Sequence, residues 1–210
     1  DTTLHALIKD TIKNHKRIIF NGNGYDDSWI KEAESRGLLN LKTTPDALPY
    51  FKTEENIELF ERQKVLSKKE VQSRYEILMD EYEKQINIEA LTMLDIAKKD
   101  ILPAASKFSK ELTDTITNKK AIGIDLTYEL ETAKKVSEYL TEAYQALITL
   151  EKDVEKLHEI DDFEKSAFYV RDFIIQDMAA LRKPCDKLEV VTSNEDWPFP
   201  TYGKLLFGIL

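Results

Sequence analysis

Four residue types are scarce in this sequence of 210 residues, which contains one Cys, six Gly, six Pro and three His. The single cysteine, Cys185, excludes an internal disulfide, offers no metal-ligand spacing and is compatible with a reducing cytosol. The low glycine and proline content, beside 33% charged residues, is typical of a helical protein whose exposed faces carry Lys and Glu. The composition therefore predicts an all-α fold.

Long apolar runs and an excess of basic residues are also missing. No stretch approaches the roughly 18 apolar residues of a membrane span, and no signal peptide is visible. The net charge is −9, and the longest basic run, Lys13–Arg17, is too short for a phosphate-binding stripe. We therefore expect no nucleic-acid and no membrane partner. Because the chain begins with Asp1 instead of Met and shows no targeting segment, we expect a piece of a longer polypeptide.

The longest helical pattern begins at Ser67 and continues to about residue 118. Apolar or small residues recur along it at steps of three and four, with one gap of seven around residue 100, so one stripe keeps facing the same side. Ser67 and Glu70 form a capping box that marks the start. Because Pro103 lacks the N–H that an α-helix needs at this position, we expect a bend or a break there.

Two further helical stripes follow. Residues 127–158 carry apolar residues in near-heptad spacing, which indicates either a coiled-coil seam between chains or the interior of an intramolecular bundle. The short connection at 122–125 favours the bundle, because short connections join antiparallel neighbours. Residues 162–183 form a third helix that Pro184 ends. The predicted fold is an all-α antiparallel helical bundle with very long helices, preceded by a smaller irregular helical region.

The predicted boundary between these two parts lies at residue 66. Residues 1–66 are expected to form short helices and loops, and residues 67–210 form the bundle. The apolar run Ile18–Phe20 predicts a buried extended segment, which enters a tight turn at Asn21–Gly24 because Asn and Gly tolerate positive φ.

Short motifs recur in a fixed order along the chain. They are FNGNGY (20–25), TPDALP (44–49), SRYE (73–76), IEALT (88–92), ILPA (101–104), KLE (187–189) and WPFPTYG (197–203). In this order they resemble the C-terminal portion of the type III glutamine synthetases, the long bacterial branch of that family. Residues 45 to about 94 are similar to the helices that close the catalytic domain, and residues after about 100 are similar to the helical extension of the type III branch.

The resemblance implies a chemistry for the parent protein. Glutamine synthetases ligate ammonia to glutamate through an ATP-derived γ-glutamyl phosphate and use Mg²⁺ or Mn²⁺. The family also implies a cytoplasmic homo-oligomer of stacked hexameric rings, in which this segment would contact the rest of the synthetase chain and neighbouring subunits. Within this segment we expect structural support and assembly, with no cofactor and no activity. The alternative is a stand-alone helical protein–protein interaction module without catalytic activity, which composition alone favours.

One motif has two interpretations. Glutamine synthetases carry an Asn-Gly-x-Gly loop near the nucleotide and substrate site, which Asn21–Gly24 resembles. The family loop is followed by Met-His, whereas Tyr25 and Asp26 follow here, so we favour a structural turn over a ligand loop. The three histidines are isolated on helical patterns and are interpreted as surface or packing residues: His5, His15 and His158. We therefore predict no catalytic, cofactor-binding or metal-binding residues.

The C-terminal segment is stiff and aromatic. Pro198 and Pro200 restrict its path, and eleven positions hold four aromatic residues: Trp197, Phe199, Tyr202 and Phe207. Trp and Tyr are enriched where a few contacts dominate binding energy, and so large an apolar patch seldom stays exposed. These four are the candidate assembly or docking residues. They either join the bundle to the catalytic body or a neighbouring subunit, or fold onto their own bundle.

Overall fold

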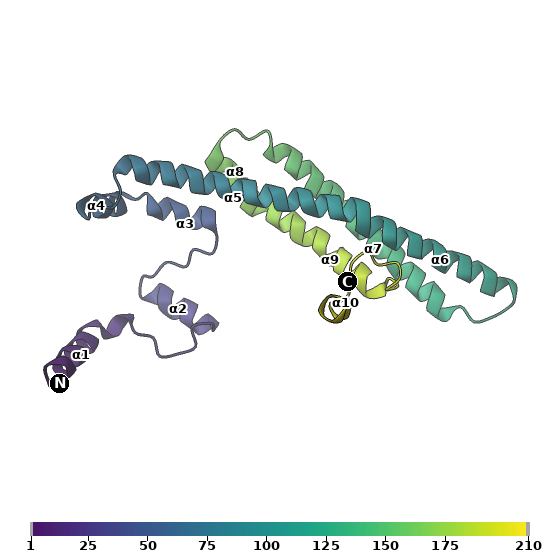
Figure 1. Cartoon of the computed structure of the whole chain (residues 1–210), viewed down its shortest axis with the longest axis horizontal. Helices are drawn as coiled ribbons and strands as arrows, with labels where there is room; N and C mark the ends of the chain where they lie inside the picture. The colour runs from purple at the N-terminus through teal and green to yellow at the C-terminus, as the bar shows by residue number, and fades with distance from the viewer. Residues whose placement is uncertain (1, 209–210) are drawn as a thin grey trace. The chain divides into compact units, whose positions relative to one another are not determined.

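The structure, a computed structural model, describes residues 2–208 apart from the side chains of Thr2 and Tyr202. Every regular element in this range is a helix (Figure 1), which confirms the predicted all-α class. The chain divides into two compact units, Asp1–Lys42 and Thr43–Leu210. Each unit is described separately below.

The first unit contains α1 (Thr2–His15), the 3₁₀ segment η1 (Lys16–Ile18) and α2 (Asp27–Ser35). The Asp26 side chain caps α2 by accepting a hydrogen bond from Ser28 N at 2.8 Å. The apolar side of α1 is exposed along its length at four residues: Leu4, Leu7, Ile8 and Ile12.

The predicted buried extended segment at residues 18–20 is wrong. Ile18 closes η1 and is 69% exposed, and Ile19 is exposed as well. Only Phe20 is shielded, because its ring packs on Trp29 with the centroids 4.2 Å apart. Residues 2–42 contain no sheet or second layer that would bury an extended apolar run.

One continuous helix dominates the second unit. It comprises α5 (Lys68–Ile96), the π-helical segment η2 (Ala97–Ile101) and α6 (Leu102–Ala121), 54 residues in all. The predicted capping box is present at its start: the Ser67 side chain accepts from Glu70 N, and the Glu70 carboxylate accepts from Ser67 N at 2.8 Å.

Pro103 does not break this helix. Immediately before it, the hydrogen bonding shifts to the π pattern, in which Leu102 N donates to the Ala97 carbonyl. Pro103 then lies in the first turn of α6, where a residue without an N–H is tolerated. The predicted break does not occur, because a single π-helical turn precedes Pro103 and the helix continues after it.

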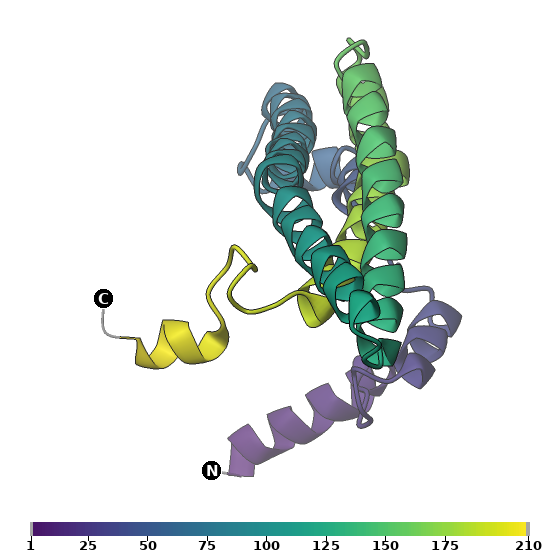
Figure 2. The same cartoon turned by 90° about the vertical axis from the view of Figure 1, so that its right-hand side faces the viewer.

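The other long helices pack against this one as an antiparallel bundle (Figures 1 and 2). α7 (Thr127–Leu157) returns along α6 and α5. A third run then packs along α7 and comprises α8 (Phe163–Tyr169), the π-helical segment η3 (Val170–Ile174) and α9 (Ile175–Val191). The predicted bundle is therefore formed within one chain, as its short connections indicated.

The third run does not end at Pro184, as the sequence predicted. α9 continues to Val191, and Pro184 lies inside it, buried together with Cys185 and Leu188. Proline inside a helix removes one hydrogen bond and crowds the preceding turn, which costs about 3 kcal/mol. Burial of this turn against α7 outweighs that cost, because packing overrides local helix preference.

The main core lies where the three runs meet. Its largest fully buried members come from α7, η3 and α9: Val136, Leu150, Val170, Ile174, Leu181 and Leu188. A smaller cluster around Tyr75, Met79 and Ala167 lies between α5 and α8. The two clusters together cover the α5 to α6 helix along successive parts of its length.

Two short helices and a terminal one complete the second unit. α3 (Thr44–Phe51) and α4 (Glu54–Arg62) contact α5 and each other, so both belong to the same compact unit as the bundle although they precede residue 66. α10 (Tyr202–Phe207) follows the loop after α9 and projects away from the bundle (Figure 2).

The core assignment predicts a large loss of stability for Leu150→Ala. Leu150 has no exposed surface, so the truncation should lower the free energy of unfolding by about 2 to 5 kcal/mol. Leu130→Ala on the same helix is the matched control, because Leu130 is 41% exposed. Chemical denaturation followed by circular dichroism measures both. Similar losses for the two variants would show that this core is wrongly assigned.

Candidate functional site

The four aromatic residues predicted at the C-terminus do not form one cluster. Trp197 packs against the main core, and its ring meets that of Phe199 edge to face with the centroids 6.3 Å apart. Phe207 lies on α10 and is 84% exposed, as are its neighbours Leu205 and Leu206 to lesser degrees. The side chain of Tyr202 lies outside the described residues. The segment thus folds onto its own bundle at one end and leaves an apolar helix unpacked at the other.

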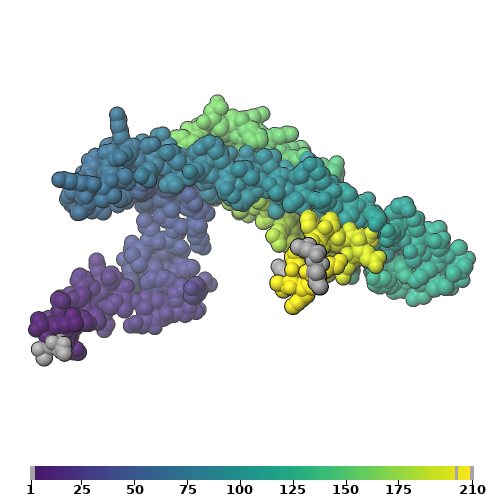
Figure 3. All heavy atoms as spheres, viewed as in Figure 1, coloured from purple at the N-terminus to yellow at the C-terminus, as the bar shows by residue number. Residues whose placement is uncertain are grey.

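An ion pair between an exposed lysine and a shielded aspartate holds the first part of this segment in place. Lys107 of α6 donates to Asp196 at 2.7 Å, and the Asp196 side chain is only 5% exposed. The hydrogen bond, followed by the negative charge of Asp196, raises the pKa of Lys107. Trp197 N also donates to the Ser193 carbonyl at 2.9 Å, which closes a turn directly after α9. The segment consequently lies against the flank of the long helix (Figure 3).

A cavity of about 470 Å³ opens beside Trp197. Its walls are apolar and come from α5, η2, α9 and the C-terminal segment: Met93, Ile96, Ile101, Leu181, Trp197 and Phe199. The Trp197 Nε1 atom is buried and has no hydrogen-bond partner in the described part of the chain. The cavity exists because Trp197 and Phe199 fold back toward the bundle, so the sequence alone did not predict it.

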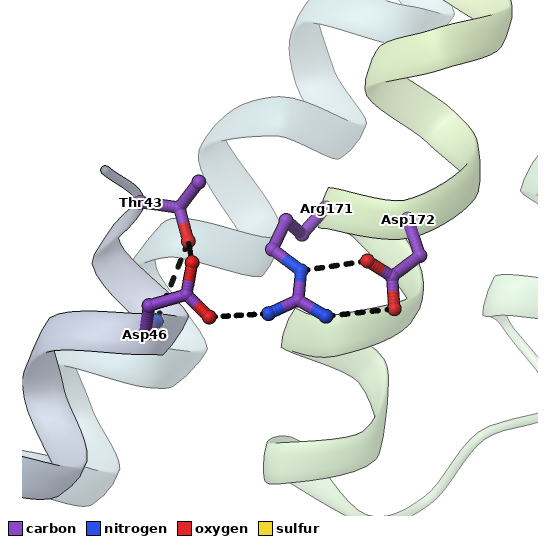
Figure 4. Close-up of polar contacts among 4 residues, drawn as sticks. All are labelled: Thr43, Asp46, Arg171 and Asp172. Carbon is purple, nitrogen blue, oxygen red and sulfur yellow. Dashed lines mark hydrogen bonds and ion pairs between the residues drawn. The ribbon is translucent and has the colours of Figure 1, made fainter. Parts of the chain in front are cut away.

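A polar network joins α3 to the π turn of the third run (Figure 4). Arg171 of η3 pairs with Asp46 of α3 and donates to Asp172 through two nitrogens, Nε at 2.6 Å and Nη2 at 2.9 Å. Thr43 completes the network by donating to Asp46. The guanidinium also lies 4.7 Å from the centre of the Phe168 ring. Arg171 is the hub of this contact, because only its planar group reaches both carboxylates.

A second network joins α3, α5 and α8. Glu164 accepts from Lys52 and from the Tyr75 hydroxyl, each at 2.6 Å. The hydrogen bond from Lys52, and then that from Tyr75, lowers the pKa of Glu164. The Lys52 ammonium also lies 3.7 Å from the centre of the Tyr75 ring. The two networks together attach α3 to the bundle at both of its ends.

Two carboxyl groups meet between α7 and α9. Asp153 accepts from Lys156 at 2.6 Å and from the Tyr169 hydroxyl at 2.9 Å, and the Asp177 carboxyl is close enough to shift its pKa. Burial, followed by the hydrogen bond and charge of Asp153, raises the pKa of Asp177 to about 6. The pKa of Asp153 is lowered, chiefly by the bond from Lys156. The pair therefore holds one proton under mildly acidic conditions, and it is ionised at neutral pH with one buried Asp177 oxygen unpaired.

The carboxyl pair predicts a pH-dependent stability. Because the folded state raises the pKa of Asp177 from 3.8 to about 6, its proton is bound more tightly when folded, so stability falls as the pH rises through this range. Asp177→Asn keeps a donor toward Asp153 but removes the charge. The variant should gain about 1 to 3 kcal/mol over the wild type between pH 4 and pH 7.

Unfolding free energies measured at several pH values provide the test. Asp161→Asn is the control, since Asp161 is exposed in the loop before α8. Curves for wild type and Asp177→Asn that stay parallel from pH 4 to pH 7 would contradict the shared proton.

The residues of these networks were not predicted from the sequence. Arg171, Glu164 and Asp177 lie on helical stretches rich in charge, and their partners are distant in the sequence or on other helices. Charge runs on helices usually mark solvated faces, and spacing along one helix does not identify a partner on another. The only sequence signal for such a pair is a charged residue within an otherwise apolar helix face.

The sequence also raised the questions of a ligand loop at Asn21–Gly24 and of metal ligands. The turn predicted at Asn21–Gly24 lies two residues later, at Asn23–Asp26, where Asp26 N donates to the Asn23 carbonyl at 3.2 Å and Tyr25 N donates to the Asn23 side chain at 3.1 Å. Tyr25 is fully exposed. Within residues 2–208, no three His, Cys, Asp or Glu side chains gather closely enough to hold a metal ion. Across the same residues, none of the helices combines the length and apolarity needed to cross a lipid bilayer.

Comparison with known proteins gives a consistent result. The model of one protein family, the glutamine synthetase C-terminal domain, matches residues 3–120. A glutamine synthetase of Butyrivibrio fibrisolvens is 38% identical over 97% of this chain, and a type-3 glutamine synthetase of Dictyostelium discoideum is 33% identical over 98%. A glutamine synthetase of Bacteroides fragilis (strain YCH46) is 25% identical over 99%. The chain spans 29% of the length of each of these relatives.

Proposed function

This chain belongs to the glutamine synthetase C-terminal domain family, and from that premise we propose that it supports and assembles a type-3 glutamine synthetase. The parent reaction would be the ATP-dependent ligation of ammonia to glutamate through γ-glutamyl phosphate. ATP and Mg²⁺ or Mn²⁺ would bind in the part of the protein outside this segment. The parent would work in the cytoplasm, in nitrogen metabolism, as a homo-oligomer of stacked hexameric rings.

One observation carries the proposed assembly role: α10 presents an apolar surface that the described residues leave largely exposed. Three consecutive apolar residues of α10 are largely exposed: Leu205 at 64%, Leu206 at 71% and Phe207 at 84%. The preceding residues are fixed to the bundle by Trp197 and by the Lys107 to Asp196 ion pair. A short apolar helix on an anchored stem loses little entropy when it docks, which favours contact with the catalytic body or a neighbouring subunit.

The two polar networks support the same role from the other end of the bundle. α3 belongs to the stretch that resembles the end of the catalytic domain, and Arg171 and Glu164 attach it to η3 and α8. A movement of α3 would therefore be resisted by charged hydrogen bonds at both of its ends. A stand-alone interaction module offers no reason for relatives to match nearly the whole chain while being more than three times longer.

The assembly role predicts different outcomes for two variants of the full-length parent. Phe207→Asp places a charge on the exposed α10 surface and should dissociate the large assembly while the helical content is kept. Trp197→Ala removes a core contact and should lower the melting temperature of the bundle first. Ile122→Asp is the control, since Ile122 is 71% exposed in the α6 to α7 connection. Light scattering and thermal melting separate the effects. An intact, fully active oligomer carrying Phe207→Asp would overturn the role of α10.

The same proposal predicts that this segment alone makes no glutamine. Phosphoryl transfer requires positioned metal ions and charge stabilisation, and we assign neither to the described residues. A γ-glutamyl transfer assay with ATP and Mg²⁺ should give the rate of a blank without protein, while the full-length parent gives a measurable rate. Activity of the isolated segment above the blank would contradict the proposal that catalysis lies outside it. Asn21–Gly24 would then be the first residues to substitute in a search for the active site.

A further inference from the structure

The cavity beside Trp197 has the size of a small-molecule site. Its volume of about 470 Å³ lies within the range of roughly 300 to 1,000 Å³ typical of such sites. Met93 and Ile96 of α5 face Met178 and Leu181 of α9 across it. Methionine side chains adapt their shape to an occupant, because three rotatable bonds and a polarisable sulfur let them fill irregular space.

Aromatic rings and sulfur atoms line this wall. Trp197 and Phe199 contribute the rings, and Met93 and Met178 contribute the sulfurs. Aromatic rings pack favourably against other rings edge to face, and methionine sulfur makes favourable contacts with aromatic rings. The wall therefore favours an aromatic occupant.

The charged residues that line the cavity carry an excess of negative charge. Four charged residues line it, and two of them, Arg182 and Asp186, pair with each other at 3.2 Å. Glu89 accepts only from the Gln85 amide at 2.8 Å, and Glu189 has no cation within 4.0 Å among the described residues. Two carboxylates without a cation therefore border an apolar cavity.

We propose that this cavity binds a small molecule with an aromatic body and a protonated amine. The aromatic body would fill the space between α5 and α9 and lie against Trp197. The ammonium group would stay at the mouth beside Glu89 and Glu189, where it keeps part of its hydration. This binding function is separate from the assembly role of α10, because no α10 residue with a described side chain lines the cavity.

Three probes that share one body test the assignment. Phenylpropylamine, phenylpropanol and phenylpropanoate carry a positive, a neutral and a negative group on the same apolar chain. Calorimetric titration of the full-length parent should rank them amine, alcohol, acid. The amine should bind about three- to tenfold more tightly than the alcohol, the range expected for partly solvated ion pairs. Cys185 also lines the cavity, so the amine should slow its alkylation, followed by mass spectrometry of the Cys185 peptide.

Matched variants locate the binding. Glu89→Gln combined with Glu189→Gln should remove the preference for the amine over the alcohol, whereas Glu155→Gln, an exposed position on α7, should not. Thr92→Trp should block all three probes, because Thr92 is an exposed residue at the cavity wall. Thr113→Trp makes the same change at an exposed position on α6 away from the cavity and should leave binding unaltered.

Several results would overturn the proposal. No calorimetric heat up to the solubility limit of the amine would show that the cavity takes no such ligand. Equal affinity for the three probes would show that Glu89 and Glu189 do not bind the ammonium group. If Cys185 of the assembled parent resists alkylation without any probe but reacts once Phe207→Asp has dissociated it, a protein segment covers the cavity instead. Binding that persists in Thr92→Trp would place the ligand elsewhere.

Discussion

The second unit depends on covering one helix that is too long for any single partner. A helix of 54 residues extends for about 80 Å, well beyond the span of an ordinary small domain. No isolated helix buries its own apolar stripe, so successive segments must pack on it in turn. α3 and α8 cover the first part of α5, and α7 covers α6, while α9 fills the space against α7. The order of elements along the chain follows from this need.

Polar contacts then fix which segment covers which part. Burying apolar area is not directional, so it would tolerate small slides of one helix along another. Arg171 with Asp46 and Glu164 with Lys52 are directional, because each hydrogen bond has a preferred geometry. The Asp153 and Asp177 pair between α7 and α9 adds a contact whose strength changes with protonation. Position within the bundle is therefore set by few residues, although most stability comes from the core.

The sequence predicted the long helices well, but it did not predict which side chains on different helices contact each other. The capping box at Ser67 and the heptad spacing of 127–158 are local signals, and both helices begin where those signals lie. The helix ends expected at Pro103 and Pro184 do not occur. A proline in the sequence shows only that one backbone N–H is missing, whereas a π turn or buried neighbours decide whether the helix continues. The charged networks and the cavity depend on residues far apart in the chain. Periodicity carries no information about such pairs.

The π-helical segment η2 has a further consequence, which concerns rotation. A π turn contains about one residue more than an α turn, and each residue of an α-helix advances by about 100° around the axis. Everything after Ile101 is therefore rotated by nearly that angle relative to an uninterrupted helix. The faces that α5 shows to α8 and α6 shows to α7 are thus set independently of each other. Loss of one residue from this turn would convert it to an α turn and leave Ala105 and Leu112 close to the positions in which they are now buried, whereas an α turn formed without that loss would rotate both residues away.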